Sequence, residues 1–161
     1  MTQNISPSIF KAYDIRGVVG ETLTVEAVRA IGLALGTKAR EAGATETVIG
    51  RDGRLSGPEL SKALSEGFRD AGIDVIDIGM VPTPVVYYAT FELGTDTGVA
   101  VTGSHNPPDY NGLKMVVAGE AIYGDAILAL RDAIASGELR PVPAEQRGSH
   151  RIEDVDQRYL D

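Results

Sequence analysis

The chain has 161 residues, the length of one domain with a core of its own. Its net charge of −8, with no cluster of basic residues, argues against a nucleic-acid partner. It has no cysteine, which suits the reducing cytoplasm where we expect it, and no apolar run reaches the ~18 residues that would predict a membrane span.

Hydrophobic periodicity and turn residues predict strands that alternate with helices. Residues 9–19 are predicted to be extended. Thr24 is the expected N-cap of a helix over 24–42, which Gly43 ends. The later elements are a strand over 46–51, a helix over 59–71 behind Pro58, a strand over 73–79, a helix over 85–93 capped by Thr83, apolar strands at 99–101 and 113–117, and a helix over 124–137.

This order predicts an α/β domain with a mixed sheet. The first three strands are separated by helices and should be parallel, whereas the last two are joined by a loop and can pair differently. We expect the domain over 1–137 and a charged, proline-containing linker over 138–161. The aromatic residues Tyr87, Tyr88 and Phe91 are interpreted as core.

The loop between the last two strands carries the most unusual composition. Pro107 and Pro108 stiffen it, Gly103 permits backbone angles closed to other residues, and Asn111-Gly112 is predicted to be a turn. It presents a hydroxyl, an imidazole and an amide at Ser104, His105 and Asn106. The residues alone leave open a functional loop and a stiffened surface loop facing water.

Residues 51–58 connect a strand to a helix through two glycines. Such a turn can bind an anion at the helix N-terminus, but the Walker A ending and the dinucleotide fingerprint are both missing. The simpler interpretation is a strand-to-helix turn with an Arg-Asp ion pair.

Three segments resemble a known family. The string Thr-Gly-Ser-His-Asn-Pro-Pro-Asp-Tyr-Asn-Gly-Leu-Lys at 102–114 closely resembles the phosphoserine loop of the α-D-phosphohexomutases, in the phosphomannomutase/phosphoglucomutase group. Tyr-Asp-Ile-Arg-Gly at 13–17 is similar to the family's N-terminal active-site segment. Gly-Arg-Asp-Gly-Arg-Leu-Ser-Gly at 50–57 is similar to a segment that supports the phosphoserine loop. The resemblance implies a three-layer α/β/α domain with one antiparallel strand in a mainly parallel sheet.

The resemblance also implies roles for individual residues. Ser104 would carry the phosphoryl group in the interconversion of hexose 1-phosphate and hexose 6-phosphate, which passes through a bisphosphate. The phosphate on Ser104 would bind Mg²⁺. The implied catalytic residues are Ser104, His105, Lys114 and Arg16, the implied substrate-binding residues are Tyr13, Arg16, His105 and Lys114, and the implied loop supports are Thr102, Gly103 and Asn106.

Only the first of the family's four domains is matched. Asp52, Asp109 and Asp125 do not form the family's Asp-x-Asp-x-Asp metal motif, so the other Mg²⁺ ligands are expected on a second domain. The expected partners are therefore a hexose phosphate and further domains of the same chain, and we expect no turnover by these 161 residues alone. Two alternatives stay open: a phosphoglucosamine mutase domain and a non-catalytic sugar-phosphate-binding module.

Overall fold

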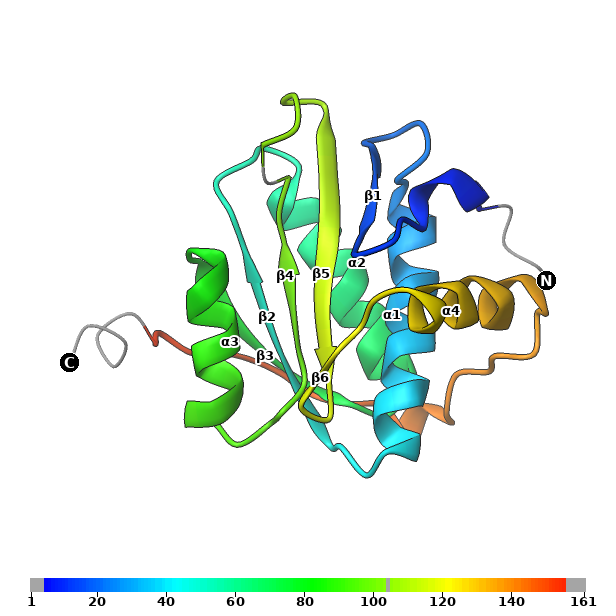
Figure 1. Ribbon diagram of the computed structural model, residues 1–161. Coiled ribbons are helices and arrows are strands. Elements are labelled where there is room, and N and C mark those ends of the chain that lie inside the picture. Colours follow the sequence, from blue (N-terminus) through cyan, green and yellow to red (C-terminus); the bar gives the residue numbers. More distant parts are fainter. Residues whose placement is uncertain (1–4, 104, 156–161) are drawn as a thin grey trace.

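The computed structural model describes residues 5–103 and 105–155, which form a mixed sheet between two layers of helices (Figure 1). The strands are β1 (Ile15–Val18), β2 (Glu46–Arg51), β3 (Asp74–Met80), β4 (Gly98–Val101), β5 (Tyr110–Val117), β6 (Glu120–Ala121) and β7 (His150–Ile152). The α-helices are α1 (Val25–Glu41), α2 (Gly57–Asp70), α3 (Thr83–Glu92) and α4 (Asp125–Ala135), and short 3₁₀ turns cover Pro7–Ile9 and Ala144–Gln146.

The sheet has the order β1-β5-β4-β2-β3-β7, with β6 paired to β5. The β2–β3, β2–β4 and β3–β7 pairs are parallel, and β5 runs antiparallel to β1, β4 and β6. The predicted three-layer α/β/α fold with a mixed, mainly parallel sheet is therefore confirmed. β7 lies inside the stretch predicted as a linker and extends the sheet beside β3.

Two apolar cores fill the two sides of the sheet. The larger joins α1, α2 and α4 to one face and includes Leu35, Phe68 and Leu113, all fully buried. The smaller packs Val86 and Ala89 of α3 on the opposite face. Residues of one strand alternate between these faces, so each strand position can be assigned to one side of the sheet.

The predicted helix caps are partly right. The Thr24 hydroxyl accepts a hydrogen bond from the Ala27 N–H (3.1 Å), and Gly43 follows α1 with φ +91°. The prediction that Thr83 caps the third helix is wrong. α3 begins at Thr83 itself, and Pro82 is the N-cap, because the Val85 N–H already bonds to the Pro82 carbonyl (2.9 Å).

Two interpretations of local sequence are wrong for reasons of packing. Asn111-Gly112 is not a turn but belongs to β5, where Asn111 is fully buried and its side-chain amide donates to Ser56 Oγ (2.8 Å). The aromatic residues of α3 are not a common core cluster, because Phe91 is 77% exposed while Tyr87 and Tyr88 are half-buried.

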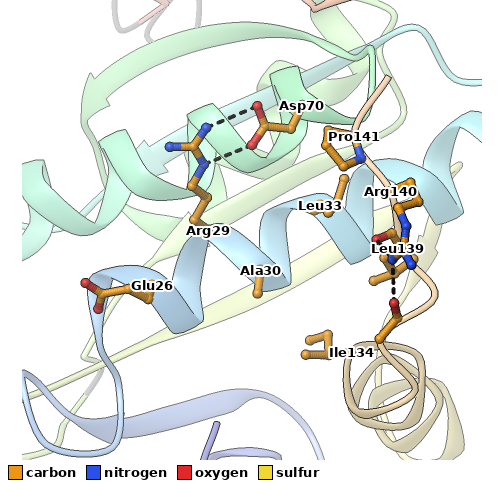
Figure 2. Close-up of a pocket in the computed structure, with 10 residues that line it drawn as sticks. Glu26, Arg29, Ala30, Leu33, Asp70, Ile134, Leu139, Arg140 and Pro141 are labelled. Carbon is orange, nitrogen blue, oxygen red and sulfur yellow. Dashed lines mark hydrogen bonds and ion pairs between the residues drawn. The ribbon is translucent and has the colours of Figure 1, made fainter. Parts of the chain in front are cut away.

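α1 and α2 are tied together at their surface by Asp70. Its carboxylate accepts hydrogen bonds from Arg29 Nε (2.9 Å), Arg29 Nη2 (3.2 Å) and Arg147 Nε (3.1 Å). Figure 2 shows the Arg29–Asp70 pair on the wall of a cavity of about 470 Å³, which is closed on its other side by Ile134, Leu139 and Arg140. None of the implied site residues that the structure describes lines this cavity.

Asp70→Asn is expected to lower stability by about 1 kcal/mol at pH 7, since Arg29 is half-exposed and its pair is screened. Burial alone would raise the pKa of Asp70, but the hydrogen bonds and charges of Arg29 and Arg147 outweigh it and lower that pKa. The stability that Asp70 gains from these arginines is therefore fully present above the ordinary aspartate pKa of about 3.9. It is lost as the pH falls through the lower pKa that Asp70 has in the folded state. Urea titrations of both proteins at several pH values should show the difference shrink on acidification. The exposed Asp132→Asn variant is the control, and a difference that grew on acidification would contradict the assignment.

No helix among residues 5–103 and 105–155 is both long enough and apolar enough to cross a bilayer.

Candidate active site

The β4–β5 loop begins at the end of a fully buried strand. All four residues of β4 are buried, and the Thr102 N–H, just beyond it, donates to the Gly112 carbonyl of β5 (2.9 Å). Ser104 lies outside the described residues. The loop on both sides of it is described, so its bracing can be followed residue by residue.

Asp52 holds the start of the loop. Its Oδ2 accepts hydrogen bonds from Thr102 Oγ1 (3.0 Å) and from the Gly103 N–H (2.9 Å). Asp52 follows β2, which is the parallel neighbour of β4, so the turns that leave these two strands meet at the same edge of the sheet. The carboxylate thus fixes the backbone one residue before Ser104.

Arg54 holds the far side of the loop. Its guanidinium donates to the backbone carbonyls of Asn106 (2.7 Å), Pro107 (2.5 Å) and Tyr110 (3.0 Å). A planar fork with several donors suits three carbonyls that point to one place. Charged donors make stronger bonds to carbonyls than neutral ones do, so this one side chain fastens most of the loop.

Gly103 is required for space rather than for its backbone angles. Its φ is outside the left-handed region, but a Cβ at this position would overlap the Arg54 guanidinium. The sequence-based reason for this glycine is therefore corrected.

Arg16 reaches the same loop from β1. It is only 9% exposed, and its Nη1 donates to the Gly103 carbonyl (2.7 Å) while Asp14 accepts from its Nη2 (2.6 Å) and Nε (3.1 Å). Gly112 permits the close approach of β1 to β5 beside this arginine, since a Cβ there would overlap the Ile15 carbonyl. A buried arginine, ion-paired with Asp14, thus contacts the residue before Ser104.

Lys114 and Tyr13 share a shallow cavity of about 380 Å³, which Tyr87 and Tyr123 also line. Ile15 and Leu113 point into the larger core, so their neighbours Arg16 and Lys114 lie on the opposite face of the sheet, on the side of α3. Burial raises the pKa of the Tyr87 hydroxyl above its ordinary value.

His105 and Asn106 differ in their surroundings. His105 is exposed. The backbone N–H of Asn106 (3.0 Å) and its Nδ2 (3.2 Å) both donate to the Gly103 carbonyl, so this residue closes the loop on itself around position 104.

In the described part of the chain no group of three or more acidic or histidine side chains could hold a metal ion. Asp109 of the loop is exposed, and Asp52, which holds the start of the loop, is already committed to Thr102 and Gly103. The described residues alone therefore do not fit a Mg²⁺ site.

The structure brings together residues that the sequence left apart. One loop is contacted by Arg16 from β1, by Asp52 and Arg54 from the β2–α2 turn, and by its own Asn106. Tyr13 and Lys114 line a separate cavity. Asp14, Tyr87 and Tyr123 are absent from the sequence-based site. From its residues alone, 51–58 was interpreted as a strand-to-helix turn, whereas the family resemblance implied that 50–57 supports the loop. In the structure Asp52 and Arg54 of this segment do contact the loop.

Comparison with known proteins identifies the family of this domain. Residues 7–140 match the family described as phosphoglucomutase/phosphomannomutase, alpha/beta/alpha domain I. The chain belongs to this family.

Its relatives agree with that assignment. A phosphomannomutase/phosphoglucomutase of Pseudomonas aeruginosa is 53% identical over 153 residues, which are 95% of this chain and 32% of the relative. A phosphoglucomutase of Neisseria meningitidis serogroup B is 48% identical over 157 residues, 98% of this chain and 34% of the relative. The crystal structure of a phosphoglucomutase/phosphomannomutase family protein from Burkholderia thailandensis superposes with a TM-score of 0.89 at 51% identity, over 97% of this chain and 35% of that one.

The chain spans about a third of the length of these family members. What it provides is domain I, in which the β4–β5 loop is braced by the turn that follows β2.

Proposed function

We propose that this chain is the phosphoserine-bearing domain of a phosphohexomutase that acts on mannose and glucose phosphates, with Ser104 as the phosphoryl carrier. The observation that supports the proposal is the bracing of the loop on both sides of position 104, by Asp52 before it and Arg54 after it. Phosphoryl transfer depends mainly on positioning and on stabilisation of charge, which a fixed loop beside a buried arginine provides.

In the proposed reaction, the P–O bond of phosphoserine 104 breaks as the free hydroxyl of a hexose monophosphate bonds to phosphorus. That hydroxyl loses its proton, and Ser104 Oγ, the leaving group, takes up a proton. The hexose bisphosphate then reorients in the cleft, so that its other phosphate faces Ser104. It returns that phosphoryl group to Ser104 Oγ, and the sugar is left with its phosphate moved between positions 1 and 6. Arg16 stabilises the transferred charge, and Lys114 exchanges the proton with the sugar oxygen. Tyr13 and His105 contact the sugar phosphate.

Mg²⁺ enters the proposal only through the family resemblance. When bound at the serine phosphate, it would neutralise charge on the transferred group. Since the described residues do not fit a metal site alone, its remaining ligands would come from elsewhere in the full-length protein.

The direct test is the location of phosphate in the full-length protein purified from its own cells. Intact mass and peptide mapping should find one phosphate on the peptide that holds Ser104, and the Ser104→Ala protein should carry none and show no mutase activity. Ser136→Ala, an exposed serine after α4, is the control that should keep both. Phosphate on another residue, or a fully active Ser104→Ala protein, would exclude Ser104 as the carrier.

The isolated 161-residue chain is expected to give no turnover in a coupled hexose-phosphate mutase assay, because one domain supplies only part of the cleft. Calorimetry with glucose 6-phosphate should likewise find only weak binding. Micromolar binding without turnover would instead favour a sugar-phosphate-binding module.

A further inference from the structure

Two tyrosines beside Lys114 have no role in the proposed reaction. Tyr87 and Tyr123 line the same shallow cavity of about 380 Å³ as Lys114 and Tyr13. Tyr123 is 60% exposed and Tyr13 is 79% exposed, whereas Tyr87 is half-buried. A single exposed aromatic side chain is ordinary at a protein surface, but here two of them border one cavity. Because these side chains are open to solvent, a ligand in the cavity can reach them.

Backbone hydrogen bonds fix the position of Tyr123. The residue before it, Ile122, donates its N–H to the carbonyl of Met115 in β5 (2.9 Å), the neighbour of the cavity's lysine. The residue after it, Gly124, donates its N–H to the carbonyl of Ala12 (2.6 Å), which directly precedes the other exposed tyrosine. The backbone of Tyr123 is thus held between the two segments that carry the expected substrate-binding residues of this cavity.

The cavity carries one positive charge that no acid opposes. Among the described residues, no aspartate or glutamate lines the cavity, and Lys114 forms no ion pair. A fitting ligand therefore has oxygen atoms or negative charge near the ammonium and an apolar face against the tyrosine rings. A hexose phosphate has both, because the C–H groups on one face of a pyranose ring pack against an aromatic ring while the oxygens stay free for polar contacts.

The strand register places this cavity close to the β4–β5 loop. Lys114 pairs with Ala100 of β4, two residues before Thr102, where the loop begins. Two strand residues span about 7 Å, which is comparable with the width of a pyranose ring. A sugar that lies in the cavity can therefore present its reacting hydroxyl toward the loop.

We propose that Tyr123 is a further substrate-binding residue, whose ring packs against the C–H face of the hexose while Lys114 faces a sugar oxygen. This inference rests on the proposed function, because it takes the hexose phosphate as the ligand of the cavity. Tyr87 contributes the wall of the cavity that belongs to α3. The contact is with the unreacting part of the sugar, so it contributes to binding rather than to the transfer step.

Calorimetry with glucose 1-phosphate on the full-length protein tests this contact. Tyr123→Ala should raise the Kd by about fivefold, the size expected for the loss of one aromatic contact, and Tyr123→Phe should recover most of the affinity because it keeps the ring. In the mutase assay, the KM of Tyr123→Ala should rise more than its kcat falls, since the ring packs against the sugar in the ground state and the transition state alike. The Tm of both variants should stay close to that of the parent, because Tyr123 is mostly exposed.

Phe91→Ala is the matched control. Phe91 is a 77% exposed aromatic residue of α3 that does not line the cavity, and its loss should leave the Kd unchanged. The inference is overturned if Tyr123→Ala binds glucose 1-phosphate as tightly as the parent, or if Tyr123→Phe loses as much affinity as Tyr123→Ala. A marked fall in the Tm of Tyr123→Ala that Tyr123→Phe restores would assign the ring a structural role and would overturn it as well.

The two proposals fail in different ways. A parent protein that binds glucose 1-phosphate but has no mutase activity would contradict the proposed function, and the Kd values of the Tyr123 variants would still decide whether the ring contacts the sugar. A parent protein that does not bind glucose 1-phosphate would overturn both.

Discussion

Gly67→Ala is expected to destabilise the fold by about 3 kcal/mol, although alanine is the better helix former by about 1 kcal/mol. Gly67 lies where α2 crosses α1. A Cβ there would overlap the Arg29 carbonyl and would approach the Gly32 Cα to 2.8 Å. These are backbone atoms of a packed helix, which cannot move aside as a side chain can, so the two helices would have to separate.

Urea unfolding of Gly67→Ala against the parent chain measures this effect. Gly57→Ala is the matched control, because it lies in the same helix but its Cβ would meet the flexible Arg51 Cδ at 3.2 Å. We expect the control to stay within about 0.5 kcal/mol of the parent. A Gly67→Ala chain as stable as the parent would show that the crossing tolerates a methyl group, contrary to the packing described here.

Arg54→Ala is expected to lower stability by about 2–3 kcal/mol and to release the β4–β5 loop. The variant removes hydrogen bonds to three carbonyls and leaves Asp52 without the nearby guanidinium, whose Nε lies 3.6 Å from its Oδ2. Some of the lost bonds will be replaced by water, so the effect is smaller than their sum. Under the proposed function, the mutase activity of the full-length protein should fall more than its substrate affinity, because the loop's position matters most in the transition state.

Hydrogen exchange and two further variants check this prediction. In Arg54→Ala, exchange should accelerate at the Asn106 and Tyr110 amides, while core amides exchange at a rate set by global stability. Arg54→Lys should recover only a small part of the loss, since an ammonium cannot reproduce the planar fork. Arg131→Ala removes an exposed arginine paired with Asp132 and should change stability little. Unchanged exchange in the loop of Arg54→Ala would mean that Asp52 and Arg16 suffice to hold it.

The features that could be predicted are those set by residues close together in the sequence. The order of strands and helices, the Thr24 cap and the bounds of β2 follow from local periodicity and turn residues, and the structure confirms them. β7 was missed because its three residues are exposed and carry no apolar pattern. Asn111-Gly112 was misinterpreted because a turn dipeptide can also serve a buried strand, where Ser56 satisfies the asparagine.

The site was predictable only in part, because local sequence patterns do not show which distant residues come into contact. Family resemblance identified the loop and several residues around it, but the contacts that brace the loop join positions about 50 residues apart, as between Asp52 and Thr102. Such contacts depend on strand order, which periodicity does not encode. The space that Gly103 leaves for Arg54 is likewise invisible until the two segments are brought together.

The position of β1 has a consequence for how the chain folds during synthesis. β1 is the first strand made, yet among the described strands it pairs with β5 alone. Ile15 therefore cannot reach its partner in the sheet until Leu113 has been made. A nascent chain leaving the ribosome therefore holds its N-terminal segment unpaired until β5 emerges. The contact from Arg16 to Gly103 likewise forms only once β1 has paired with β5, so this part of the loop's bracing is completed after β2, β3 and β4 have been made.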